Sequence, residues 1–225
     1  MAYILNIETS TKNCSVGLAK DGKTIVLKEL NDEGYSHAEK LHEFIKNVIS
    51  EANLSISNLD AIAVGKGPGS YTGLRIGVSA AKGLCFALNI PLIAINTLQS
   101  LAESISKPKD SFIIPLIDAR RMEVYSAVFK NNMQVKNVAA EIIQENSFSE
   151  FLVKSNVYFL GDGAEKCKDI IIHKNANFIE NKFPSANEMS KLSFEKYKKN
   201  NIEDVAYFEP FYLKDFIVTT SKKLI

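Results

Sequence analysis

Short apolar runs separated by turn residues open the chain. Residues 3–7, 14–19 and 24–30 are mostly apolar, and a polar turn at residues 10–13 separates the first two runs. The pair Asp21-Gly22 separates the second from the third. Asp-Gly favours a tight hairpin because glycine accepts the positive φ of such a turn. The pattern predicts three antiparallel strands.

The next segment has a helical period. Between residues 36 and 52, the apolar positions recur at intervals of three and four, which places them on one face of a helix. Ser36 and Glu39 form a capping-box pattern at its start, and Asn53 follows its end. We predict a helix over residues 36–52.

A strand, a glycine-rich turn and a second long helix follow. Residues 60–65 are nearly all apolar, which is typical of a strand buried on both faces. The turn at residues 65–69 leads into a helix predicted over residues 70–88, and residues 91–95 form another strand. The predicted order, β-β-β-α-β-α-β, is complete within about the first hundred residues.

A second unit is expected from residue 98 onward, so we divide the chain into residues 1–97 and 98–225. We predict helices over residues 98–105, 164–173 and 189–199, and strands over residues 112–117, 122–129 and 157–160. Residues 107–110 form a boundary loop, residues 131–132 a turn and residues 183–185 a linker. The path after Pro210, including a return to the first unit, stays open.

The glycine-rich turn carries candidate anion chemistry. A buried strand ends there and a helix begins, so free N–H groups and the positive end of the helix dipole point at one place. Gly67 and Gly69 allow close approach of a ligand, Ser70 and Thr72 offer hydroxyls, and Arg75 offers a guanidinium. The alternative is an ordinary turn with a Ser or Thr cap. The spacing does not match a Walker A loop.

The helix after this turn has two faces to bury. Its apolar seam is spaced four, three, four and three: Leu74, Val78, Ala81, Cys85 and Leu88. Gly73 and Gly77 form a second face, and each interior glycine costs about 0.5–1 kcal/mol relative to alanine. Close approach of another backbone would offset that cost. Packing within the chain is one explanation; we favour contact of one face with another protein.

Composition and charge limit the function classes. The 225 residues carry 27 Lys and Arg against 26 Asp and Glu, so there is no global attraction to nucleic acid. The basic stretches at residues 196–199 and 222–223 are interpreted as solvated surface. Cys14, Cys85 and Cys167 form no CxxC pair, which argues against a disulfide framework or zinc ribbon. With no signal peptide and no membrane-length apolar run, we expect a cytoplasmic protein.

Two groups of polar residues are candidate sites. His37 and His42 are five positions apart, about 140° around a helix, so they cannot clamp a metal together. With only His173 besides these two, no metal site is predicted. Asp118, Arg120 and Glu123 form a charged cluster in a strand-turn-strand region. It is either a partner or nucleotide contact, or a salt bridge that locks the hairpin.

Several motifs together resemble a known family. They are the segment Gly65-Lys-Gly-Pro-Gly-Ser-Tyr-Thr-Gly-Leu-Arg-Ile-Gly77, the opening Ile4-Leu-Asn-Ile-Glu-Thr-Ser10 with Cys14-Ser-Val16, Ser36-His37, Ile117-Asp-Ala-Arg120 with Glu123-Val-Tyr125, and Tyr212-Leu-Lys214. In this order they resemble the TsaB (YeaZ) family over nearly the whole chain. The resemblance implies an actin/Hsp70/sugar-kinase-like (ribonuclease H-like) α/β fold with two related subdomains.

The resemblance also implies a role and partners. It implies a non-catalytic subunit of the complex that forms N6-threonylcarbamoyladenosine on tRNA, paired with the catalytic paralogue TsaD and joined by TsaE in the larger complex. It implies contact with tRNA only through the complex, and a homodimer through the same helices as an alternative. No cofactor is expected for this chain alone, and ATP with Mg²⁺ is expected at the joint site with TsaD.

The family pairs with TsaD through helices of its first domain. Mapped onto this sequence, the expected contact residues are Ser36, His37, Leu41, Ile45, Gly73, Leu74, Gly77, Val78, Ala81 and Cys85. We expect no catalytic residues.

A second hypothesis is a small ATP-dependent kinase or ATPase of the same fold class. Such kinases place an Asp in the first strand-turn to handle the metal, and here Glu8, Thr9 and Ser10 occupy that place. Gly161-Asp-Gly163 sits where a second phosphate loop is expected, although a bare strand-to-helix turn is the favoured interpretation. A peptidase is a third hypothesis and ranks last.

Overall fold

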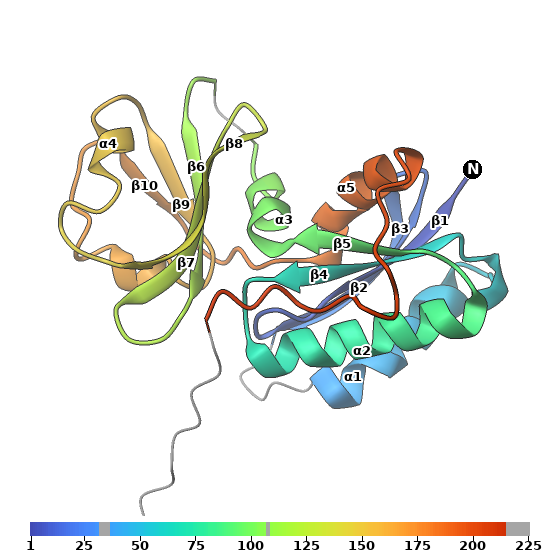
Figure 1. Cartoon of the computed structure of the whole chain (residues 1–225). Coiled ribbons are helices and arrows are strands. Elements are labelled where there is room, and N and C mark those ends of the chain that lie inside the picture. The colour runs from blue at the N-terminus through green and yellow to red at the C-terminus, as the bar shows by residue number, and fades with distance from the viewer. Residues whose placement is uncertain (32–36, 107–108, 215–225) are drawn as a thin grey trace, which may run out of the picture.

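A computed structural model describes residues 1–31, 37–106 and 109–214. Within them the chain forms two lobes, each built on a five-stranded mixed sheet (Figure 1). The first sheet has the order β3-β2-β1-β4-β5 and comprises β1 (Tyr3–Glu8), β2 (Asn13–Lys20), β3 (Lys23–Asn31), β4 (Ala61–Gly67) and β5 (Leu92–Asn96). The second has the order β10-β9-β6-β7-β8 and comprises β6 (Phe112–Asp118), β7 (Glu123–Lys130), β8 (Met133–Ile142), β9 (Val157–Leu160) and β10 (Ala176–Ile179).

The described part of the chain also contains five α-helices and two short 3₁₀ turns. They are α1 (His37–Glu51), η1 (Ile56–Asn58), α2 (Tyr71–Leu88), α3 (Thr97–Glu103), α4 (Ser149–Leu152), η2 (Glu165–Cys167) and α5 (Ala186–Lys198). No helix among the described residues has the length and apolar character that crossing a bilayer requires.

The first sheet follows the predicted order. β1, β2 and β3 are antiparallel, and the hairpin between β2 and β3 turns at Asp21 and Gly22 with φ angles of 50° and 81°. β4 lies parallel to β1, and β5 lies parallel to β4. The connections through α1 and α2 make those parallel pairings possible, because a parallel pair needs a long crossover.

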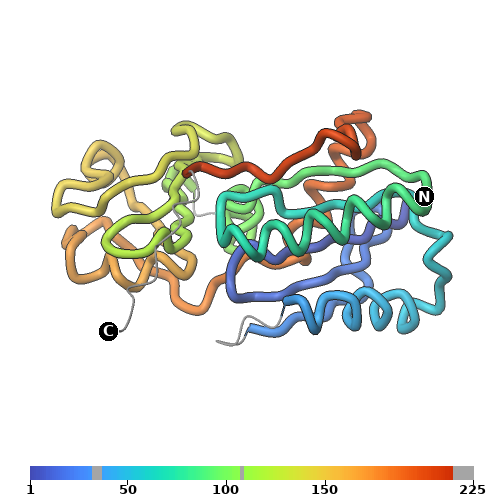
Figure 2. Tube along the Cα trace, turned by 60° about the horizontal axis from the view of Figure 1, so that its bottom comes forward, coloured from blue at the N-terminus to red at the C-terminus, as the bar shows by residue number. Residues whose placement is uncertain are grey.

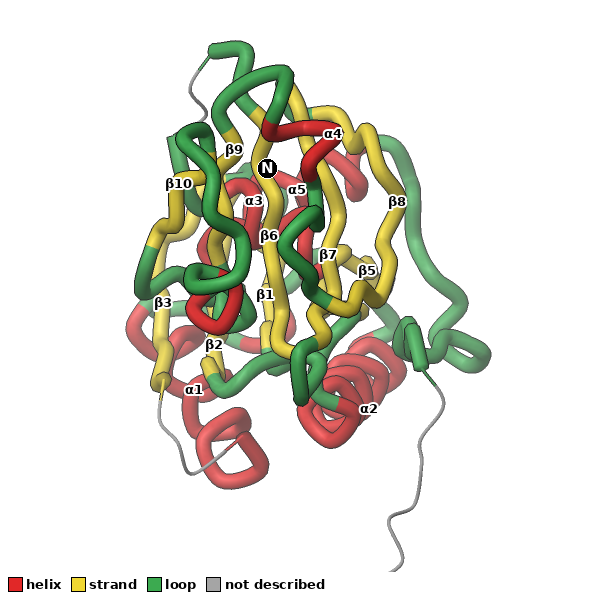
Figure 3. Tube along the Cα trace, turned by 90° about the vertical axis from the view of Figure 1, so that its left-hand side faces the viewer, coloured by secondary structure: helices red, strands yellow, loops and turns green. Residues whose placement is uncertain are grey.

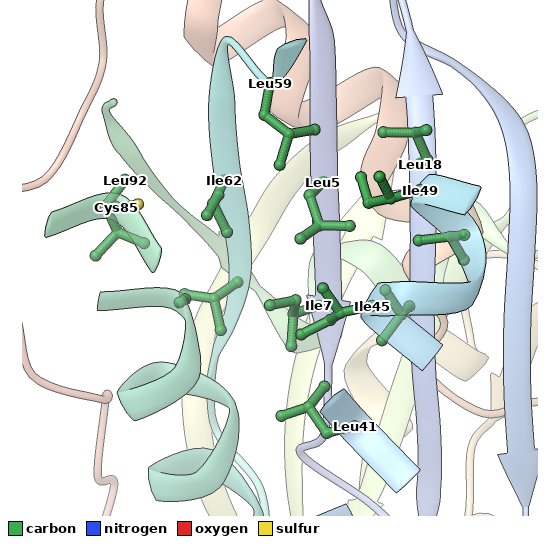
Figure 4. Close-up of a cluster of buried hydrophobic side chains, with 14 of the residues drawn as sticks. Leu5, Ile7, Leu18, Leu41, Ile45, Ile49, Leu59, Ile62, Cys85 and Leu92 are labelled. Carbon is green, nitrogen blue, oxygen red and sulfur yellow. The ribbon is translucent and has the colours of Figure 1, made fainter. Parts of the chain in front are cut away.

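Helices cover both faces of this sheet. α1 and α2 lie side by side on one face, whereas α5 packs on the other (Figures 1 and 3). The core on the α1–α2 side contains Leu5, Ile7, Leu41, Ile45 and Ile62, none of them more than 5 % exposed (Figure 4). α3 lies between the two sheets, where Leu98 and Leu101 pack against β6 and β7.

The C-terminal part of the chain returns to the first lobe. Met189 of α5 is fully buried against Ile4, Ala61 and Ile93. Farther on, the Glu203 amide donates to the Leu92 carbonyl at 2.8 Å on β5. The chain then runs back toward the second lobe (Figure 2). The division at residues 97 and 98 separates the two sheets, but residues 186–203 belong with the first sheet by packing.

Local differences from the predicted elements have physical causes. The helix expected over residues 164–173 is reduced to η2 followed by turns, because Cys167 and Ile171 already fill the second core and β10 starts at Ala176. The strands β8 and β10 and the short α4 were not predicted. β8 is exposed at half of its positions and half-buried at the others, without a clear alternation, and β10 has only four residues.

The remaining predicted elements are confirmed within a few residues. Ser185 caps α5 by accepting from the Asn187 amide at 3.1 Å, so that helix starts three residues before its predicted position. Ser36 and its capping box lie outside the described residues, as do residues 107–108 of the boundary loop and the basic pair at residues 222–223.

Candidate functional site

The glycine face of α2 packs against the turn that follows β1. The Thr9 hydroxyl donates to the Gly73 carbonyl at 2.8 Å, and the Ser70 amide donates to the Ser10 carbonyl at 2.7 Å. A methyl group added at Gly73 would overlap the Thr9 carbonyl, and one at Gly77 would overlap the Thr9 hydroxyl. The close approach that the glycines indicated is therefore made within the chain.

The apolar seam of α2 is also buried in its own lobe. Leu74, Val78, Ala81 and Cys85 are each at most 4 % exposed. On α1, Leu41 and Ile45 are at most 5 % exposed. The other described members of the expected partner set are His37, Gly73 and Gly77, and all three are buried. The His37 ring lies 2.7 Å from the Thr11 carbonyl, which ties the start of α1 to the β1–β2 turn.

The expected partner residues thus support the surface from beneath. The outward side of α2 is formed by what we call the outer stripe: the exposed residues Thr72, Ser79, Gly83 and Phe86, with Ile76 half-buried between them against the first core. Phe86 is 85 % exposed, and a side chain at Gly83 would meet nothing within 4 Å. Sequence reasoning missed this stripe, although its spacing of four, three, four and three is as regular as that of the buried seam.

The neighbouring helix extends this surface. α1 contacts α2 on the same face of the sheet. A hollow of about 450 Å³ lies on α1 and the segment after it, lined by His42, Lys46, Ile49, Leu54 and Ile56 among others. Its lining is mainly apolar side chains with a few polar tips. Together α1 and α2 present a face that a second protein could cover.

The candidate phosphate residues separate into two groups. A cavity of about 370 Å³ between the lobes is lined by Ser10, Gly69, Ser70 and Thr72 from the first lobe. Glu8, Thr9, Gly67 and Arg75 do not line it. The Ser70 hydroxyl accepts from the Gly73 amide at 3.2 Å, so this side chain already caps α2, as in the alternative interpretation of the turn.

Glu8 is poorly placed to hold a metal. It is fully buried, and its carboxylate accepts from the Ser10 amide at 2.7 Å. The carboxyl group abuts Gly65, where an added methyl group would overlap it. Burial raises the pKa of Glu8 above its ordinary value, more strongly than the contacts with Ser10 and Thr9 lower it. An enclosed carboxyl group with a raised pKa is poorly suited to metal binding.

Arg75 points toward the C-terminal segment. Its Nε donates to the Tyr212 hydroxyl at 3.2 Å, and its guanidinium lies 4.1 Å from the centre of the Tyr71 ring. The group proposed for phosphate binding therefore already has two partners within the chain.

The charged cluster of the second lobe is engaged internally. The Asp118 carboxylate accepts from the Arg120 amide at 3.0 Å and pairs with Lys166. Glu123 pairs with Lys214. Asp118 and Arg120 nevertheless line the interlobe cavity, together with Asp162, whose pKa burial raises. These ion pairs join the hairpin to Lys166 and Lys214 and do not close within the hairpin, so the choice between a partner or nucleotide contact and a hairpin lock stays open.

Comparisons with known proteins show which proteins have a sequence similar to this chain. Residues 34–222 match the sequence model of the TsaD family, described as tRNA N6-adenosine threonylcarbamoyltransferase. The chain is 30 % identical to the tRNA threonylcarbamoyladenosine biosynthesis protein TsaB of Bacillus subtilis over 94 % of this chain and 93 % of that one. It is 28 % identical to TsaB of Haemophilus influenzae over 98 % and 96 % of the two chains.

A solved structure gives the same result at the level of the fold. YeaZ from Pseudomonas aeruginosa superimposes with a TM-score of 0.82 at 25 % identity, covering 95 % of this chain and 100 % of that chain. The expected actin-like fold with two α/β subdomains is confirmed by this match and by the two mixed sheets.

Proposed function

This chain belongs to the TsaB (YeaZ) family, and we propose on that premise that it is a non-catalytic subunit in the formation of N6-threonylcarbamoyladenosine on tRNA. In this proposal it binds and activates the catalytic relative TsaD. The observation that carries the proposal is full-length similarity to TsaB combined with an uncovered face on α1 and α2. The protein would act in the cytoplasm.

The outer stripe supports the proposed contact. Phe86 exposes most of its ring on a helix whose glycine face and apolar seam are buried. Gly83 lies one turn before Phe86 and Ser79 lies two turns before it. Both are small and leave room for a neighbouring backbone. A large aromatic side chain beside small residues is a common anchor in protein interfaces. The partner residues expected from the resemblance hold this stripe in position from below.

Replacing the exposed aromatic ring tests this surface. Phe86→Asp should lower the affinity for TsaD roughly 10- to 100-fold, because it removes an apolar anchor and buries a charge. Val153→Asp is the matched control, since Val153 is 71 % exposed in the second lobe. Binding is measured by calorimetry after circular dichroism has shown that both variants are folded. Equal affinities of Phe86→Asp and the original chain would place the interface elsewhere.

The activating role needs a separate measurement. We expect TsaD, TsaE and substrates to modify tRNA efficiently only when this chain is added, with ATP and Mg²⁺ at the joint site with TsaD. Phe86→Asp should lower this activity in proportion to complex formation. If the chain binds TsaD but the modification rate does not change, binding stands and activation does not. A homodimer through the same face should dissociate as TsaD is added.

The interlobe cavity favours one alternative, a small ATPase of the actin-like class. Its size and its hydroxyl-bearing first-lobe lining suit a phosphate-containing ligand. The enclosed position of Glu8 weighs against catalysis there. ATP turnover by the isolated chain with Mg²⁺, lost in Glu8→Ala, would favour this alternative over the accessory role.

A further inference from the structure

A short segment near the C-terminus touches both lobes. We call residues 209–214 the strap. The Phe211 amide donates to the Lys66 carbonyl at 2.7 Å, at the end of β4. The Phe211 carbonyl lies so close to Gly67 that a methyl group there would sit 2.7 Å from it. Gly67 has a φ of 109°, which suits glycine. The strap backbone is thus seated on the first lobe.

Tyr212 attaches the strap to the first turn of α2. The Tyr212 and Tyr71 rings lie 4.8 Å apart between centroids, and Arg75 stacks on Tyr71 while bonding the Tyr212 hydroxyl. Ring–ring and cation–ring contacts of this kind add stabilisation beyond the burial of the rings. The three side chains form one stacked group on the first lobe.

Two residues farther on, the strap reaches the second lobe. Lys214 pairs with Glu123 at the start of β7. Both side chains are partly shielded, with exposures of 40 % for Lys214 and 21 % for Glu123. Glu123 and Lys214 both lie in motifs that the sequence singled out, and the proposed partner surface uses neither motif.

Among the described residues, two other stretches of chain cross between the lobes, and they lie together. α3 and residues 180–185 both pass from one lobe to the other, and the Ser100 hydroxyl donates to the Ser185 carbonyl at 3.4 Å. α3 also contacts α5, which covers the sheet face opposite α1 and α2. The strap instead crosses beside the start of α2, and it lines the interlobe cavity. The strap and the paired crossings therefore connect the two lobes at two separate positions.

We propose that the strap is a latch that holds the two lobes together beside α2, and that its release lets them swing apart about the paired crossings at α3 and residues 180–185. The latch joins Tyr212 on the first lobe to the Lys214–Glu123 pair on the second. This inference is independent of the proposed binding to TsaD. Release would widen the cavity lined by Ser10, Ser70, Asp118 and Arg120.

The distance between the lobes tests the latch. Spin labels are placed on cysteines introduced at Ser50 on α1 and Val153 on the second lobe, both exposed. The natural thiols of Cys14, Cys85 and Cys167 are buried and should not be labelled. The original chain should give one narrow distance distribution by double electron–electron resonance. Tyr212→Ala/Lys214→Ala should add a population at longer distance.

A matched control and a charge swap separate the latch from general destabilisation. Tyr207→Ala/Lys199→Ala changes the same residue types at exposed positions outside the strap and should leave the distribution unchanged. Lys214→Glu should lengthen the distance, and Lys214→Glu/Glu123→Lys should restore it. Unchanged distances in a folded Tyr212→Ala/Lys214→Ala variant would overturn the proposal, as would failure of the charge swap to restore the distance.

Discussion

Two glycines of the same helix have opposite surroundings. Gly77 faces the Thr9 side chain so closely that a methyl group would overlap its hydroxyl, whereas Gly83 faces open space. Only the first is required by packing. Gly77→Leu would therefore disturb folding and could not report on a partner interface alone.

Alanine at these two positions should change stability in opposite directions. Gly77→Ala should lower the free energy of unfolding by about 1–3 kcal/mol through overpacking. Gly83→Ala should raise it by about 0.5–1 kcal/mol, since alanine restricts the unfolded chain and suits a helix. Urea unfolding measures both. Thr9→Ala should relieve part of the Gly77→Ala cost, and strictly additive effects would argue against the contact.

Glu8 makes stability depend on pH. Its ordinary pKa is 4.5, and burial raises the pKa in the folded state. The folded state therefore holds the proton more tightly than the unfolded state does. The stability that this proton provides is complete below pH 4.5 and is lost as pH rises from there through the raised pKa.

Glu8→Gln should remove this dependence because the amide stays neutral. Relative to the original chain, the variant should gain free energy of unfolding as pH rises above 4.5, by at most about 1.4 kcal/mol per pH unit. Urea titrations from pH 4.5 to 8 would measure the difference. Glu51→Gln is the control, since Glu51 is half exposed. A difference that does not vary with pH would show that folding does not raise the pKa of Glu8.

At the scale of elements, α2 and α5 show how one helix serves several surfaces. α2 buries a glycine face against the β1–β2 turn and an apolar seam in the core, and it leaves its outer stripe exposed except at Ile76. α5 lies late in the sequence but seals the opposite face of the first sheet. Both helices were predicted, whereas the surfaces they would meet were not.

A substitution at Met189 tests how much α5 contributes to the stability of the first lobe. Met189→Ala should lower the free energy of unfolding by about 2–5 kcal/mol, because it leaves a cavity against β1, β4 and β5. Lys191→Ala on the exposed side of the same helix should change it little. Thermal unfolding of both variants measures this. Equal melting temperatures would mean that α5 does not stabilise the first sheet.

The missed elements of the second lobe share a weak local signal. β8 is exposed at half of its positions and carries polar side chains such as Gln134 and Lys136, so its alternation is faint. β10 gains its strand character by pairing in parallel with β9. Each of these strands is held by hydrogen bonds to a neighbour, β8 to β7 and β10 to β9, so the sequence of each segment contains little that predicts it.

For the whole molecule, the charge balance bears on tRNA. With a formal net charge of +1, the chain has no overall electrostatic pull on a phosphate backbone. A gel-shift at physiological salt should show little binding of tRNA by this chain alone, because non-specific affinity depends on phosphate neutralisation. Binding should appear when TsaD is added. Tight, salt-sensitive binding by the isolated chain would contradict this expectation.

The sequence by itself determined the periodic elements and the family. Alternation, helical spacing and the Asp21-Gly22 hairpin are local properties, and the segment from Gly65 to Gly77 is long enough to be specific. Only the tertiary structure decided which helix faces are buried by contacts within the chain. A glycine face or an apolar seam fits a foreign backbone and the chain's own turn equally well. The Thr9 contact, the return of α5 and the strap bring together residues far apart in sequence, and spacing along the chain does not record such contacts.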